Sequence, residues 1–225
     1  MCKFIGKEVM EIYVDASLKN IEERTFTCSG VLCTNTHEEK YVVSQDSTNN
    51  RGELLAVYMG CCMANKNMLA EPDRYARINL YSDSQFVIFG LRKWMSGWLN
   101  NCDSKGIMYG STGKPVKNQE MFKMIISFCV INKLIIHFYN QRGHTNINSP
   151  RDLAMANNQF LRANGVMLPP EDIWKISFYN DIVDKNSRAM LENLNPADYP
   201  IFHHNPNAVQ MCHYVVPADY SAYIK

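Results

Sequence analysis

Glu11-Ile12-Tyr13-Val14-Asp15, near the start of the chain, is apolar and β-branched apart from the acids at its two ends. This pattern predicts a strand that delivers an acid at its end. Residues 25–34 and 40–44 predict the next two strands, and the polar residues 35–39 between them predict a turn. Three successive strands joined in this way predict an antiparallel meander at the start of the fold.

The chain after this meander alternates between helical and strand patterns. Ser47-Thr48-Asn49-Asn50 is a cluster of helix-capping residues, and the apolar residues behind it recur at helical spacing over residues 50–67. The remaining expected elements are a strand at 77–82, helices from 84 to about 89 and around 94–98, a helix at 119–130, a strand at 134–139 and a helix at 151–163. The order βββαβααβα predicts an α/β (α+β) fold, a five-stranded mixed sheet flanked by helices.

Composition narrows the class of protein. The chain has 225 residues, of which 46% are hydrophobic and 20% charged, so it can bury a core. Its formal charge of +1 gives no overall attraction to nucleic acid. The longest apolar stretch, residues 121–139, is interrupted by polar and charged residues, so no membrane association is expected.

The cysteines and the N-terminal residues indicate the cellular compartment in which the protein is expected. The eight cysteines form no CxxC pair and no zinc-type spacing with histidine, and most lie among apolar neighbours. Reduced, buried thiols are therefore expected. Residues 1–6 do not resemble a secretory signal, so we expect a cytoplasmic protein in a reducing compartment.

The composition changes near Gly165. The last 60 residues contain six of the nine prolines and five of the twelve tyrosines, and they are acidic on balance. We therefore predict two parts, a domain at 1–165 and an irregular C-terminal extension at 166–225. A flap over apolar surface, a docking segment for a protein partner and a dimer contact are all open for the extension.

Four acids stand at the boundaries of expected elements: Asp15, Glu53, Asp83 and Asp152. Each alone has a structural explanation, either as a turn former or as a charge that complements a helix dipole. Together they would repel one another unless they bind a hard divalent cation such as Mg²⁺ or Mn²⁺. Two such ions can hold the attacking and leaving oxygens of an in-line phosphoryl displacement, so the set indicates metal-assisted phosphodiester cleavage.

Five short motifs in order along residues 9–164 closely resemble type 1 ribonuclease H. They are Thr48-Asn49-Asn50-Arg51-Gly52-Glu53-Leu54, Tyr81-Ser82-Asp83-Ser84-Gln85-Phe86-Val87, Trp94-x-x-x-Trp98, Gly113-Lys114-Pro115-Val116-Lys117-Asn118, and Gly143-His144 followed by Arg151-Asp152-Leu153-Ala154. The resemblance implies a ribonuclease H-like fold for the first part of the chain. It also implies an endonuclease that hydrolyses the RNA strand of RNA–DNA hybrids with two Mg²⁺ ions, for which Mn²⁺ can substitute, and leaves 5′-phosphate and 3′-hydroxyl ends.

The resemblance assigns a role to individual residues. It implies that Asp15, Glu53, Asp83 and Asp152 are the metal-binding carboxylates and that His144 assists proton transfer or product departure. The residues implied to contact the substrate are Thr48 and Asn118 at a DNA phosphate, Asn49, Asn50 and Gln85 on the RNA side, and Phe86, Trp94 and Trp98 along the DNA backbone. Lys114 and Lys117 belong to a locally basic stretch, residues 91–118, that suits phosphate binding.

Other interpretations remain open. Trp94 and Trp98 at helical spacing also fit an ordinary core stripe, and His144 also fits a structural loop histidine. Residues 16–20 have no glycine, unlike the turn that usually follows this first acid, and the stretch from His144 to Asp152 is short. A hybrid-binding module without turnover, or another nuclease of this fold that acts on DNA, is therefore the alternative. The expected partner is an RNA–DNA hybrid, with no organic cofactor and with any protein partner and the replication step unknown.

Overall fold

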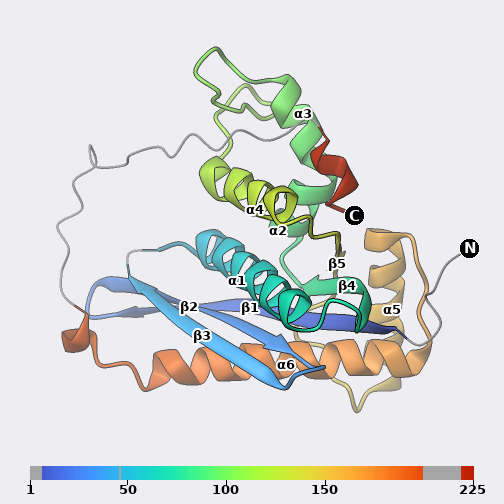
Figure 1. Ribbon diagram of the computed structural model, residues 1–225. Coiled ribbons are helices and arrows are strands. Elements are labelled where there is room, and N and C mark those ends of the chain that lie inside the picture. Colours follow the sequence, from blue (N-terminus) through green and yellow to red (C-terminus); the bar gives the residue numbers. More distant parts are fainter. Residues whose placement is uncertain (1–6, 46, 200–218) are drawn as a thin grey trace, which may run out of the picture.

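A single mixed sheet with helices on both faces forms the fold (Figure 1). The computed structural model describes residues 7–45, 47–199 and 219–225. The strands, in the spatial order β3-β2-β1-β4-β5, are β1 Glu8–Ile21, β2 Arg24–Cys33, β3 Glu38–Gln45, β4 Tyr75–Ser82 and β5 Ile136–Asn140. The helices are α1 Asn49–Ala70, α2 Gln85–Phe89, α3 Met95–Asn100, α4 Gln119–Ile131, α5 Pro150–Asn164 and α6 Pro170–Glu192, with a π-helical turn at Gly90–Trp94 between α2 and α3. The predicted five-stranded mixed sheet is confirmed, since β1, β2 and β3 are antiparallel while β4 and β5 continue parallel to β1.

Strand β1 is longer than its sequence pattern indicated. It pairs with β2 from Ile12, opposite Cys33, to Ile21, opposite Arg24, so the glycine-free residues after Asp15 are strand and not a loop. The turn comes at Glu22 and Glu23, which both have positive φ (50° and 63°). The expectation that Asp15 ends a strand was therefore wrong. Pairing with β2 in a long hairpin extends β1 beyond the apolar residues that precede Asp15.

Helix α1 covers one face of the sheet. Its first turn is capped by Thr48, whose hydroxyl accepts a hydrogen bond from the backbone N–H of Arg51. Gly60 allows close approach to the sheet, because an added Cβ would lie 2.8 Å from Leu80 and 3.1 Å from Val14. The main core lies between this helix, α4 and the face of the sheet that contains Ile12, Val14 and Leu80.

Helix α6 covers the opposite face, so the expectation of an irregular extension was wrong for residues 170–192 (Figure 1). The sequence does contain a helix signal, with Pro170 at the first position, acids in the first turn and buried residues at helical spacing from Ile173 to Leu191. The high proline and tyrosine content of the whole extension concealed that signal. Residues 200–218 of the extension, including His203, His204 and His213, lie outside the described residues.

The C-terminal residues lie along the free edge of β5. The backbone N–H of Ile136 donates to the carbonyl of Tyr223, and the N–H of Phe138 donates to the carbonyl of Lys225. Ile136 and Ile224 form a parallel bridge. The end of the chain thus covers part of an edge that would otherwise present unpaired backbone groups.

The described cysteines are reduced. In the described part of the chain six cysteines are free, and the sulfurs of Cys61 and Cys129 lie 3.8 Å apart in the core. Among the described residues, no helix combines the length and the apolar character needed to cross a bilayer.

Gly30 on β2 lies in close contact with α6. An added Cβ would lie 2.6 Å from Ser187 Oγ, 2.7 Å from the Tyr41 ring and 2.8 Å from Val183. We expect Gly30→Ala to lower the free energy of unfolding by about 1–3 kcal/mol, because α6 or Tyr41 must shift. Urea unfolding measures this, with Gly97→Ala as control because its Cβ has no neighbour within 4 Å. Equal stability of Gly30→Ala and wild type would contradict the described packing of α6.

Candidate metal centre and nucleic-acid surface

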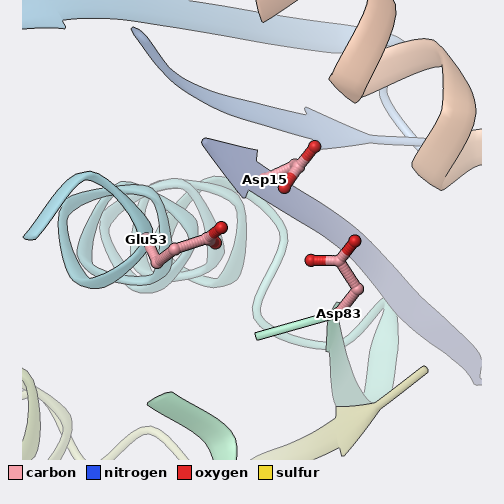
Figure 2. Close-up of side chains that lie close together, drawn as sticks. All are labelled: Asp15, Glu53 and Asp83. Carbon is pink, nitrogen blue, oxygen red and sulfur yellow. The ribbon is translucent and has the colours of Figure 1, made fainter. Parts of the chain in front are cut away.

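Three carboxylates converge where β4 ends (Figure 2). Asp15 comes from β1, Glu53 from the first part of α1, and Asp83 from the residue after β4, and each offers an oxygen within 4.8 Å of the others. The strand register explains the meeting of the two aspartates. The last parallel pair is Tyr13 with Tyr81, and Asp15 and Asp83 each follow it by two residues on the same face of the sheet.

The three carboxylates share a buried and mutually repulsive environment. Asp15 and Glu53 are each 4% exposed. Burial, followed by the charges of Asp83 and Asp184, raises the pKa of Asp15 to about 8. Burial and the charge of Asp15 raise the pKa of Glu53, and burial raises the pKa of Asp83 although His144 opposes that rise.

The donor set suits a hard divalent cation. Glu53 Oε2 is buried without a hydrogen-bond partner, and it belongs to a side chain that points toward Asp15 and Asp83 (Figure 2). A cation bonded to these oxygens would satisfy that atom and offset the repulsion among the three charges. The residues present therefore fit an Mg²⁺ or Mn²⁺ site.

Asp152, which the sequence resemblance included with these acids, is placed elsewhere. Its carboxylate lies 3.8 Å from Arg142, and its backbone N–H donates to Ser149 Oγ in the capped first turn of α5. It is not a member of the three-carboxylate group. The acid that contacts Asp15 is instead Asp184 of α6, which occupies the sheet face beside Asp15.

A cavity of about 570 Å³ opens onto the carboxylates. Asn49, in the first turn of α1, lines it and hydrogen-bonds Glu53 with its side chain. His144 also lines it, with Nδ1 3.5 Å from Asp184 Oδ2 and 3.5 Å from a terminal nitrogen of Arg188. The structure thus brings His144 to the site from a loop in which it adopts a positive φ of 49°.

Gly143 is required for the close approach of this loop to Asp83. A Cβ at Gly143 would overlap Asp83 Oδ2 and would lie 3.1 Å from its Cγ. Because the carboxylate can rotate away, we expect Gly143→Ala to change the melting temperature little but to weaken divalent-cation affinity about 10-fold. Calorimetric titration with Mn²⁺ measures this. Unchanged affinity would show that Asp83 need not keep its present orientation.

The predicted aromatic residues form one contiguous group. Ring centroids are 6.4 Å apart for Phe86 and Trp94, and 5.9 Å apart for Trp94 and Trp98. Phe86 and Trp98 also pack on Phe122 in the main core, whereas Trp94 is 40% exposed. The group is therefore partly a core stripe and partly an aromatic surface.

The polar residues predicted to grip phosphate lie at two helix N-termini. Thr48 caps α1 and Asn118 precedes α4, and an ion pair of 2.7 Å between Arg51 and Glu120 joins the first turns of these helices. Neighbouring helix N-termini favour an anion. Asn50 is exposed in the first turn of α1.

Gln85 and the two predicted lysines lie outside the carboxylate cavity. Gln85 lines a separate cavity together with Lys93, Arg142 and Arg162. Lys114 and Lys117 are exposed on residues 101–118, a segment held by short bridges such as that between Tyr109 and Pro115.

Several residues at the site that the sequence did not indicate come from α6. Asn180 hydrogen-bonds Asp83, Asp184 contacts Asp15, and Arg188 binds Asp184. Their spacing of four residues places them on one face of a helix, which is the signal that could have found them once α6 was recognised.

The known proteins that this chain resembles in sequence belong to one family. Residues 7–159, more than half of the chain, match the RNase H family. Ribonuclease H of Actinobacillus succinogenes is 37% identical over 99 residues, which cover 44% of this chain and 54% of that protein. Ribonuclease H of Bartonella tribocorum is 30% identical over 148 residues, covering 61% and 79%. For the first relatives matched, the chain spans about half of their length.

Solved structures resemble this chain more distantly. A foamy viral protease-reverse transcriptase in complex with dsDNA matches with a TM-score of 0.46 and 18% identity, over 74% of this chain and all of that one. LC11-RNase H1 in complex with an RNA/DNA hybrid matches with a TM-score of 0.38 and 16% identity, over 79% and 98%.

Proposed function

Since this chain belongs to the RNase H family, we propose that it is an endonuclease that hydrolyses the RNA strand of RNA–DNA hybrids. The observation that supports this most directly is the convergence of Asp15, Glu53 and Asp83 on one point beside an open cavity. The proposed products have 5′-phosphate and 3′-hydroxyl ends. Hybrids formed during DNA replication are a suitable source of substrate.

Asp15, Glu53 and Asp83 would hold Mg²⁺, or Mn²⁺ in its place, and we propose two ions in all. When bound, such ions supply Lewis-acid stabilisation of the phosphate and lower the pKa of a coordinated water. The chain's own part is to fix three oxygens in place before the cation arrives, because β1, α1 and β4 are all anchored in the core. His144, exposed at the mouth of the same cavity, is positioned to exchange a proton with solvent or product.

Selection of a hybrid would depend on side chains on both sides of the carboxylates. Asn49 and Asn50, exposed at the start of α1, are short amides suited to the 2′-hydroxyls and base edges of an RNA minor groove. The aromatic group of Phe86, Trp94 and Trp98 would receive the DNA backbone. Thr48 and Asn118 would hold a DNA phosphate at their helix N-termini, with Lys114 and Lys117 adding positive charge.

The test is cleavage of a hybrid labelled on its RNA strand, in Mg²⁺, Mn²⁺ or EDTA, beside duplex DNA and duplex RNA. Metal-dependent cutting of the RNA in the hybrid alone is expected. Cutting of duplex DNA would favour another nuclease of this fold. Tight binding of the hybrid with no cutting in either metal would contradict the proposed activity and leave a binding module.

A further inference from the structure

We propose that Asp184, on helix α6 and outside the segment that matches the family, is the fourth carboxylate ligand of the divalent-cation site. The inference deepens the proposed function, since it concerns the same metal centre. It gives part of the C-terminal extension a role in that centre. It also replaces Asp152, which the sequence motif had indicated for this position.

Contacts along the whole helix fix its position on the sheet. Successive residues on one face of β1 meet successive turns of α6: Glu11 pairs with Lys175, the Tyr13 ring lies 5.1 Å from that of Tyr179, and Asp15 contacts Asp184. Because β1 and α6 run in the same direction, this alignment brings Asp184 to Asp15 and does so through packing that is independent of any cation. The position of Asp184 is therefore set by the fold.

One carboxylate oxygen of Asp184 is held by an arginine, and the other lies at the cavity. The Asp184 side chain is 9% exposed, and its Oδ1 forms an ion pair of 2.9 Å with Nε of Arg188. Its Oδ2 lies 3.5 Å from His144, at the cavity that also contains Asp15, Glu53 and Asp83. Arg188 orients the carboxylate but leaves that second oxygen available.

Two observations at the cluster point to a cation. Asp15 and Asp184 are two buried acids whose side chains touch at the cavity, an arrangement that a cation beside their oxygens would stabilise. Independently, the buried Glu53 Oε2 has no hydrogen-bond partner. Asp15 belongs both to the group of three carboxylates and to the contact with Asp184, so it links Asp184 to that group.

Asp152 differs from Asp184 in its position. Its carboxylate lies near Arg142, its helix α5 packs against β5 and α6, and it does not line the carboxylate cavity. Its position outside the lining of the cavity is what separates Asp152 from the three carboxylates.

The experiment measures cation binding directly, without relying on catalysis. Wild type, Asp184→Asn and Asp152→Asn are titrated with Mn²⁺ by calorimetry, and the Mg²⁺-induced rise in melting temperature is recorded for each. Asp181→Asn is the matched control, because it removes one acid from the same helix, where Asp181 does not line the cavity and forms an ion pair with Lys185. We expect Asp184→Asn to weaken Mn²⁺ binding at least about 10-fold and to reduce the Mg²⁺-induced shift, whereas Asp181→Asn behaves as wild type.

Wild-type Mn²⁺ affinity in Asp184→Asn, or a loss confined to Asp152→Asn, would overturn the proposal. Near-UV circular dichroism confirms folding, and Asp184→Ser serves instead if the asparagine variant does not fold. Hybrid cleavage is measured in parallel. If wild type binds Mn²⁺ through Asp184 but cuts no hybrid, the proposed function fails while the assignment of this ligand stands.

Discussion

Replacement of Asp83 by asparagine is expected to reduce metal-dependent cleavage of the RNA strand of a hybrid by about 1,000-fold or more. Asp83 is one of three carboxylates whose oxygens lie within 4.8 Å of one another. An asparagine keeps the shape of the side chain but removes the negative charge that would hold the cation. The initial cleavage rate, measured with Mg²⁺ and with hybrid in excess, gives the comparison.

The stability of this variant separates loss of function from loss of fold. Because Asp83 is half-buried beside other acids, removing its charge should leave the metal-free protein at least as stable as wild type. Asp181→Asn, at a residue that does not line the cavity, is the control for a single lost charge and should cleave as wild type does. Cleavage by Asp83→Asn at more than about a tenth of the wild-type rate would contradict the proposed metal centre.

The metal-free protein is expected to lose stability as the pH rises from about 4 to about 8. Asp15 has an ordinary pKa of 3.8, and the folded protein raises that pKa to about 8. Between these values the folded state holds a proton that the unfolded state has released, so unfolding becomes easier with rising pH. The stabilising contribution is fully present below pH 3.8 and is lost as the pH passes through the folded-state value.

The variant Asp15→Asn isolates this contribution, since its amide can donate to Asp184 at every pH. From pH 5 to pH 8 in EDTA, the unfolding free energy of the variant should rise by roughly 2 kcal/mol relative to that of wild type. Urea unfolding at several pH values measures the difference, which cancels the titration of surface groups. Saturating Mg²⁺ should stabilise wild type more at pH 8 than at pH 5 and should stabilise the variant little. Parallel pH profiles of the two proteins would show that Asp15 ionises at its ordinary value.

Much of the fold could be predicted because the relevant signals are local. Alternation of apolar residues located β2, β3 and β4, and helical spacing behind Thr48 located α1. The true end of β1 was not predictable in this way, because residues 16–21 are strand only through their pairing with β2. Helix α6 was missed for a different reason: its helical pattern lies within a segment whose overall composition is typical of irregular chain.

The candidate site likewise has residues that local sequence patterns predict and residues that depend on long-range packing. Asp15, Glu53 and Asp83 are identifiable from sequence because each sits at a fixed distance from an element with a strong local pattern, and the strand register then brings them together. Asp152 also matches a motif, but no local pattern specifies which way the start of α5 faces.

The identity of the three central acids was therefore determined by the sequence itself. The neighbour of Asp15 was decided only by tertiary structure, because Asp184 lies 169 residues further along the chain and reaches the site through the packing of a whole helix on the opposite face of the sheet. The position of α6 depends on many contacts together, such as those of Gly30 and Tyr13 with their partners on the helix. Because these contacts join residues that are far apart in the sequence, no local sequence pattern predicts them.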